Sequence, residues 1–377
     1  MDSRSSFSTP PHVRLLGWIL GLIAVIIVTA IFLGGYGGLS MLTGIVTKAP
    51  AQQGSAPTGA LLLALTTRLN STSTAIALVP ATLPVANDHA SYLAADQLQS
   101  GRAMTLQYAL SPNSIYATFI GSPYTKDAKT GAGSVSESMN VYRAYLEGVH
   151  DGASLLTALQ SATISSRPSN ADYLRQFPAV SNSGEILFSS LSAKTYSQAG
   201  SSLSAVPADS WNILIVTADG TTTAITQGLR PKWIDATHFA FLKNDGIYLY
   251  DLTAKTEQKV WASDAMITVV QGFDVSDDGT YVAFSDPASA SLVIIHALNW
   301  TGDILSVVAQ VPVVATNLAF SPDDMYLAAV VLRPGSGSSA SKLVPDIEYY
   351  SLASQQFLTN AVPIDPSVTS IYISDWR

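Results

Sequence analysis

The sequence predicts an all-β fold, a six-bladed β-propeller, preceded by a single N-terminal transmembrane helix. Residues 15–33 contain no charged side chain. A unit of about 45 residues, opening with a serine-containing turn, recurs along the remainder of the chain. Strand patterns without neighbouring partners occur at both ends of that remainder. Together these observations predict an anchored chain whose main part closes on itself as a ring.

The anchor comes first in the chain. An uncharged helix of 19 residues is about 28 Å long, which spans the hydrocarbon core of a bilayer. We expect a signal-anchor helix at residues 15–35, with residues 1–14 cytoplasmic because Arg4 and Arg14 precede it. A cleaved signal peptide is the alternative, although its apolar region is usually shorter. We interpret residues 36–59 as a linker. Because residues 1–14 are expected to be cytoplasmic, residues 60–377 are expected on the extracytoplasmic side, periplasmic or extracellular.

Composition excludes several function classes. Charged residues make up 12% of the chain and the net charge is −8. Such a surface offers no basic stripe for phosphates, so we expect no nucleic-acid partner. The chain contains no cysteine, which excludes disulfides and cysteine-based zinc sites.

The repeated unit begins with a short turn that leads into an apolar strand. Its clearest copies are Val275–Phe284 (VSDDGTYVAF) and Phe320–Ala329 (FSPDDMYLAA), and weaker copies occupy residues 110–119, 180–188 and 233–241. Pro presets the first corner of such a turn, Asp or Asn caps it, and Gly tolerates a left-handed corner. Several strands that follow are apolar on both faces, as four-stranded sheets packed around an axis require.

The ring is expected to close through the two ends of this domain. Five nearly complete units lie between about residues 103 and 362. The strand pattern within residues 366–377 lacks a following partner, and the patterns within residues 60–80 lack an opening turn. Pairing these segments would complete a sixth blade.

Three sequence segments resemble the repeat of a known protein family. SPDDMYLAAV, SDDGTYVAFSD and DGIYLYDL resemble the WD40-like (PD40-type) repeat of the TolB family, over about residues 105–375. The resemblance implies a six-bladed propeller that works in the bacterial envelope. In place of that family's separate N-terminal α/β domain, this sequence has the apolar segment.

No catalytic constellation is visible in the sequence. There is no G-x-S-x-G elbow and no H-E-x-x-H pair, and His238 and His296 are expected to be structural residues within strands. The pairs Asp277-Asp278 and Asp323-Asp324 recur at the same turn position, which favours turn capping over calcium binding or acid–base chemistry. We therefore predict no catalytic residue, no metal and no cofactor.

A binding surface is predicted on exposed aromatic residues and inserted loops. Trp300, in a polar turn, and Tyr124, within the insert 121–138, are the candidates, and a second insert covers residues 194–210. Trp233 and Trp261 occupy strand positions and are expected to pack between blades.

The leading functional hypothesis is a non-catalytic scaffold for protein partners in the cell envelope, held to the membrane by its own helix. A glycan or small-ligand receptor is the alternative, and a propeller hydrolase is a third. The fold alone does not choose among them.

Overall fold

The computed structural model describes residues 57, 60–67, 74–80, 91–93, 104–122, 124–126, 133–135, 139–147, 157–159, 161–168, 172–198, 203–297, 305–334, 343–358 and 368–376. All of them belong to the compact unit Ser55–Arg377. The predicted cytoplasmic segment 1–14 and transmembrane helix 15–35 lie outside the described residues, as does the predicted linker 36–59 apart from Pro57. Within the described ranges, no helix is long and apolar enough to cross a membrane.

Five blades are each formed by one uninterrupted stretch of chain and named here by their innermost strand. Each is a four-stranded antiparallel sheet. The β4 blade contains β4 (Met104–Leu110), β5 (Tyr116–Ser122), β8 (Asn140–Tyr145) and β9 (Thr163–Ser166). The β10 blade contains β10 (Asp172–Val180), β11 (Ile186–Ser192), β12 (Asn212–Val216) and β13 (Thr222–Gln227). The β14 blade contains β14 (Leu229–Trp233), β15 (His238–Lys243), β16 (Gly246–Asp251) and β17 (Thr256–Ala262).

The remaining two of these blades lie nearer the C-terminus. The β18 blade contains β18 (Phe273–Val275), β19 (Tyr281–Asp286), β20 (Ser291–Ala297) and β21 (Leu305–Val311); the β22 blade contains β22 (Ala315–Phe320), β23 (Tyr326–Pro334), β24 (Leu343–Ser351) and β25 (Gln356–Phe357). Every blade follows the order inner strand, second strand, third strand, outer strand. The repeated sequence unit therefore corresponds to one blade.

The number of such blades corrects the sequence prediction. Six blades were expected, whereas five, not six, are built from consecutive strands. A further four-stranded sheet, in the order β26-β1-β2-β3, is composite. It joins β26 (Val368–Trp376) to β1 (Ala60–Thr67), β2 (Thr74–Pro80) and β3 (Ser91–Leu93).

The composite sheet brings the two ends of the domain together. β26 pairs antiparallel with β1, from Leu61 opposite Trp376 to Thr67 opposite Val368, with irregularities in register near each end. This is the pairing expected for residues 366–377 with residues 60–80. Unpaired strand edges are unfavourable, and the pairing gives each terminal strand a neighbour.

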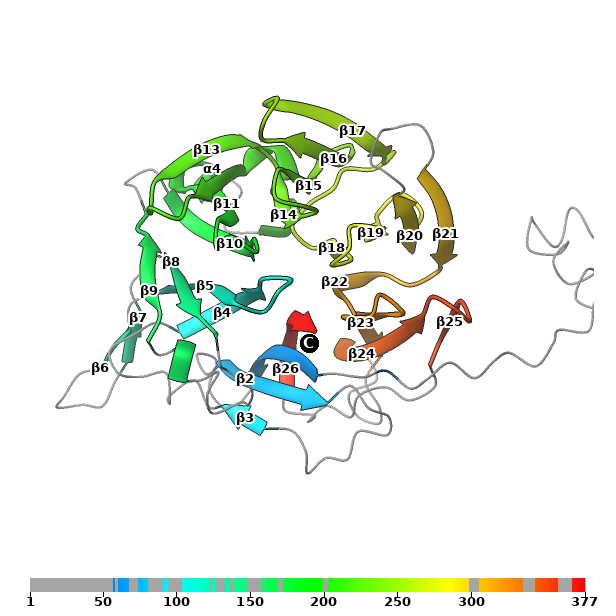
Figure 1. Ribbon diagram of the computed structural model, residues 1–377. Helices are drawn as coiled ribbons and strands as arrows, with labels where there is room; N and C mark the ends of the chain where they lie inside the picture. Colours follow the sequence, from blue (N-terminus) through cyan, green and yellow to red (C-terminus); the bar gives the residue numbers. More distant parts are fainter. Residues whose placement is uncertain are drawn as a thin grey trace, which may run out of the picture. The chain divides into compact units, whose positions relative to one another are not determined.

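The innermost strands form a closed ring around a central axis, and we call the end of this axis at which the five blade-forming inner strands finish the channel mouth. Contacts run from β4 to β10, β14, β18, β22 and β26, and from β26 back to β4. Figure 1 shows the sheets arranged radially about this axis, with the end of the chain beside it. A β-propeller is the all-β fold that has this arrangement.

The core lies between neighbouring sheets and explains why the strands are apolar on both faces. The first six residues of β11 are buried. One cluster joins the β10, β14 and β18 blades around Trp211. Another packs Leu61, Ile371 and Trp376 of the composite sheet against Tyr349 of the β22 blade. Burial of these side chains on both faces holds adjacent sheets together.

The two inserts form small additional elements. Residues 121–138 contain the last residues of β5 and a hairpin of β6 (Tyr124–Lys126) and β7 (Gly133–Val135), which is separate from the blades. Residues 194–210 contain most of the helix α4 (Ala193–Gln198) and the short 3-10 turns η3 (Leu203–Ala205) and η4 (Ala208–Ser210).

Candidate binding site at the channel mouth

Four nearly identical turns join the innermost strand to the second strand in four of the blades. We call the turns at this position in each blade the inner turns. The first residue is always serine, whose Oγ accepts a hydrogen bond from a later backbone N–H at 2.9–3.0 Å. The serines are Ser111, Ser181, Ser276 and Ser321. The same side chain thus stabilises each turn in the same way.

The third turn residue caps the corner, as the sequence predicted for the acidic pairs. Ser276 Oγ donates to Asp278 Oδ1 at 2.8 Å, and Thr280 N donates to the same oxygen at 2.8 Å. In the β22 blade, Asp323 Oδ1 accepts from Ser321 Oγ at 2.6 Å and from Met325 N at 3.1 Å. These two carboxylates therefore stabilise the turns that hold them.

The fourth turn residue has a left-handed backbone, and in one blade it is an aspartate. Gly184 and Gly279 occupy this position with φ of 83° and 73°, whereas Asp324 has a φ of 53°. Oδ1 of Asp324 is buried without a hydrogen-bond partner in the described part of the chain. Burial, and then the nearby charge of Asp278, raise the pKa of Asp324 to about 7.

The β14 blade uses a different inner turn. Asp235 Oδ1 accepts hydrogen bonds from the backbone N–H of Thr237 at 2.7 Å and of His238 at 2.8 Å. Burial acts to raise the pKa of Asp235, but hydrogen bonds from Thr237 and His238 outweigh it and lower that pKa. Nδ1 of His238 lies 2.9 Å from Asp235 Oδ2, and its Nε2 lies 3.6 Å from Asp251 Oδ2. His238 therefore contacts carboxylates at both ring nitrogens.

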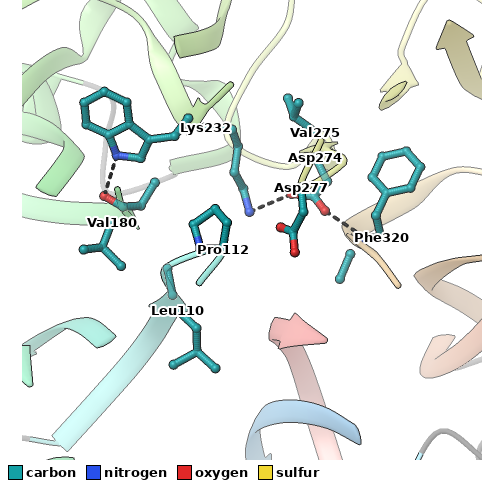
Figure 2. Close-up of a pocket in the computed structure, with 12 residues that line it drawn as sticks. Leu110, Pro112, Val180, Lys232, Asp274, Val275, Asp277 and Phe320 are labelled. Atoms are coloured by element: carbon teal, nitrogen blue, oxygen red, sulfur yellow. Dashed lines mark hydrogen bonds and ion pairs between the residues drawn. The ribbon is translucent and has the colours of Figure 1, made fainter. Parts of the chain in front are cut away.

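At the channel mouth, where the inner turns gather, an ion pair joins two inner strands. Nζ of Lys232 in β14 lies 2.7 Å from Oδ1 of Asp274 in β18. The other oxygen of Asp274 accepts a hydrogen bond from the backbone N–H of Phe320 in β22, at 2.9 Å. Figure 2 shows both interactions and places Lys232, Asp277 and Pro112 around the same space. Two side chains and one backbone N–H group thus connect three blades at this mouth.

Two cavities open at this mouth and share Pro112, Trp233 and Asp277. The smaller, of about 60 Å³, is lined by the last residues of the five inner strands β4, β10, β14, β18 and β22, together with residues of the inner turns. The larger, of about 330 Å³, is lined mainly by the inner turns of the β10 and β14 blades, with Pro112 and Asp277 from the inner turns of the β4 and β18 blades. A cavity of this size admits one amino-acid side chain or a small ligand.

A buried arginine lies further along the inner strands. Arg230 in β14 is 5% exposed, and its Nη2 donates to the carbonyl oxygens of Val269 at 3.0 Å and Thr316 at 3.2 Å. Its guanidinium carbon lies 4.1 Å from the centre of the Phe177 ring. Burial lowers the pKa of Arg230 to about 10, against the opposing effect of Tyr372 and Asp274, so it remains charged near neutral pH. Arg230 of the β14 blade thus contacts the β10 blade, the β22 blade and the segment between β17 and β18.

Comparison with known proteins identifies the fold. No family model matches the sequence, and no curated protein sequence matches it. The solved structure of TolB from Acinetobacter baumannii matches with a TM-score of 0.55 and 12% identity, covering 85% of this chain and 68% of that chain.

The chain folds as a TolB-like β-propeller. A putative TolB from Agrobacterium tumefaciens matches at 11% identity over 80% of this chain and 88% of that chain, with a TM-score of 0.44. An oligogalacturonate lyase in complex with manganese matches at 11% identity over 81% of this chain and 85% of that chain, with a TM-score of 0.42. At these identities the similarity concerns the fold alone.

The two predicted aromatic candidates, Trp300 and Tyr124, stay predictions. Trp300 lies outside the described residues. Tyr124 begins β6, in the two-stranded hairpin separate from the blades. Within the ranges that the structure describes, no group of three or more His, Asp or Glu side chains could hold a metal ion.

Trp233 was expected to pack between blades, and it does so only in part. Its Nε1 donates to the carbonyl oxygen of Ala179 in the neighbouring blade at 3.3 Å, and its ring meets Phe239 edge-on at 6.3 Å. It also lines both cavities, which the sequence analysis missed. Lys232, Asp274 and Arg230 were missed as well. The sequence offered one signal for these three residues. They are charged side chains on inner strands, in a chain that has few charged residues.

Proposed function

We propose that this chain is a membrane-tethered, extracytoplasmic propeller that acts as a non-catalytic scaffold for protein partners in the cell envelope. The uncharged segment 15–33 supports the tether. The contact surface is the channel mouth, and the proposal adds the composite sheet to the five contiguous blades as a sixth blade that closes the ring.

One observation carries the proposal. The mouth cavities are assembled by inner turns that come from different blades and are held by the same serine hydrogen bonds. Such turns present loop residues on a rigid support, which is the usual arrangement of a binding surface. The apolar side chains of Trp233, Ile234 and Pro112 lie there beside polar ones, as protein interfaces commonly require.

Four of the carboxylates near the mouth support a non-catalytic role. Asp278, Asp323 and Asp235 each accept backbone hydrogen bonds of their own turns, so their first role is to hold the turns. Asp274 is committed to Lys232 and to the backbone of Phe320. A general acid or base requires a carboxyl group able to exchange a proton with a substrate.

Site-specific photocrosslinking in the native membrane tests the proposal. Ala236, exposed in the wall of the larger cavity, is replaced by p-benzoylphenylalanine, and Met266, exposed between the β17 and β18 strands, serves as the control position. We expect one discrete protein adduct from position 236 and none from position 266. Equal adducts from both positions, or no adduct from 236 together with substrate turnover by the purified protein, would reject the proposal.

A glycan receptor is the second candidate, and Trp233 favours it. The indole lies with Asn182 and Asp235 in the wall of the larger cavity, and stacking on an aromatic ring beside polar groups is a common way to bind a sugar. Binding of immobilised envelope polysaccharides to the purified full-length protein, lost in Trp233→Leu, would favour this second candidate.

A further inference from the structure

The larger cavity combines an aromatic wall with acidic groups. Its lining includes Trp233, Ile234 and Pro112 on the apolar side, and the carboxylates of Asp235 and Asp277 on the polar side. Each carboxylate comes from the inner turn of a different blade, so the two are held apart by the scaffold. The cavity therefore places two carboxylates from different turns beside one apolar wall.

Positive charge is scarce around this cavity. Among the described residues that line the two cavities, Lys232 is the one cation, and its ammonium group is paired with Asp274 at 2.7 Å. Asp278 in the same turn and Asp323 in the inner turn of the β22 blade add further carboxylates. Asp235 has His238 as its close cationic neighbour when that ring is protonated. The mouth therefore has an excess of negative charge that a positively charged partner would complement.

The dimensions and walls of the cavity fit one extended basic side chain. A volume of about 330 Å³ exceeds that of a single lysine or arginine side chain. Such side chains lay their methylene groups along apolar surface and keep the charged end near polar groups. The face of an indole also attracts a cation, and arginine stacks on such rings.

We infer that a lysine or arginine side chain of the partner protein enters this cavity, with its charge beside Asp277 and Asp235 and its methylene groups against Trp233 and Pro112. The inference rests on the proposed function, since it names the chemistry of the partner at the same mouth. The protein partner is thus recognised by a basic residue in an exposed segment.

The test uses a labelled octapeptide with two arginines and the same peptide with both arginines replaced by citrulline, which has the same shape without the charge. Fluorescence anisotropy measures binding to the full-length protein in detergent micelles. We expect at least fivefold tighter binding of the arginine peptide, and at least a threefold loss in Asp277→Asn and in Asp235→Asn. Asn retains the oxygen that accepts the turn hydrogen bonds of Asp235.

Asp219→Asn is the matched control, because Asp219 caps a turn in the β10 blade through Thr221 N at 3.0 Å and does not line either cavity. We expect no change in that variant. Equal binding of the two peptides, or equal effects of Asp277→Asn and Asp219→Asn, would overturn the inference.

The crosslinking experiment separates this inference from the proposed function. A discrete adduct at position 236 that persists unchanged in Asp277→Asn would leave the scaffold proposal standing and overturn the basic-residue inference. An adduct whose yield falls at least threefold in Asp277→Asn, but not in Asp219→Asn, would support both.

Discussion

The ammonium group of Lys232 lies 2.7 Å from Oδ1 of Asp274 and links the β14 and β18 strands at the channel mouth. The side chain of Asp274 is 9% exposed and that of Lys232 is 31% exposed. A buried carboxylate requires partners for both oxygens, and the backbone N–H of Phe320 is the second partner. One aspartate thus connects three inner strands.

Replacing Asp274 by alanine should destabilise the propeller by about 2 kcal/mol, because it leaves the buried N–H of Phe320 without an acceptor. Lys232 can turn to solvent and contributes less. Asp274→Asn keeps an acceptor oxygen and should lose about 1 kcal/mol. Urea unfolding of the full-length protein in micelles, followed by tryptophan fluorescence, measures the two losses. Equal losses would contradict the role assigned to the Phe320 hydrogen bond.

Replacing Arg230 by methionine should lower the unfolding free energy by about 3 kcal/mol, because the carbonyl groups of Val269 and Thr316 lose their donor and the contact with Phe177 is weakened. Arg230→Lys should also destabilise, since an ammonium cannot reproduce the planar guanidinium. A double-mutant cycle with Phe177→Leu, measured by thermal unfolding, isolates the ring contact. Strict additivity of the two substitutions would argue against that contact.

Asp324 should make stability fall as pH rises. Its pKa is raised to about 7, so the folded state holds a proton that the unfolded chain releases near pH 4. The stabilising contribution is fully present below about pH 4 and is lost as pH rises to about 7. In Asp324→Asn, this loss should disappear, and stability at pH 8 should rise by about 1 kcal/mol after solvent screening. Denaturation curves at pH 5 and pH 8 measure it; an unchanged difference would contradict the prediction.

Trp376 should be required for ring closure. It is fully buried in β26, and its ring centre lies 5.1 Å from that of Tyr349 in the β22 blade. Trp376→Ala should destabilise by about 4 kcal/mol, and Trp376→Phe, which keeps an aromatic ring, by about half of that. Limited proteolysis should then cut the composite sheet before the other blades. Uniform cleavage across all blades would show that closure does not depend on this residue.

The repeated turns could be predicted from the sequence because their determinants are local. Ser276 and Asp278 lie two residues apart and hydrogen-bond within one turn. The strands that follow are apolar on both faces, which already indicated sheets covered on each side. The pairing of β26 with β1 could be anticipated because each had a strand pattern without a neighbour. The periodicity predicted six blades, whereas five are built from consecutive strands.

The candidate site could not be predicted in the same way. Lys232 and Asp274 come from different blades, and Arg230 bonds to carbonyl groups 39 and 86 residues away. No local pattern encodes such contacts, since the curvature of the ring creates them. Trp300 and Tyr124 were chosen for exposure, whereas Trp233 was assigned to packing because it lies in a strand. Its position at the end of β14 gives it both roles.

The composite sheet determines when this domain can finish folding. Leu61 pairs opposite Trp376, so β1 and β26, the first and last of the strands that the structure describes, must both be present before the ring can close. Contacts this distant along the chain form slowly, because a long loop must be closed first. During synthesis the propeller is therefore an open arc with an unpaired strand edge, the state most exposed to aggregation. Completion of the ring waits for the nine-residue strand β26, and the domain becomes resistant to misassembly only once that strand has paired with β1.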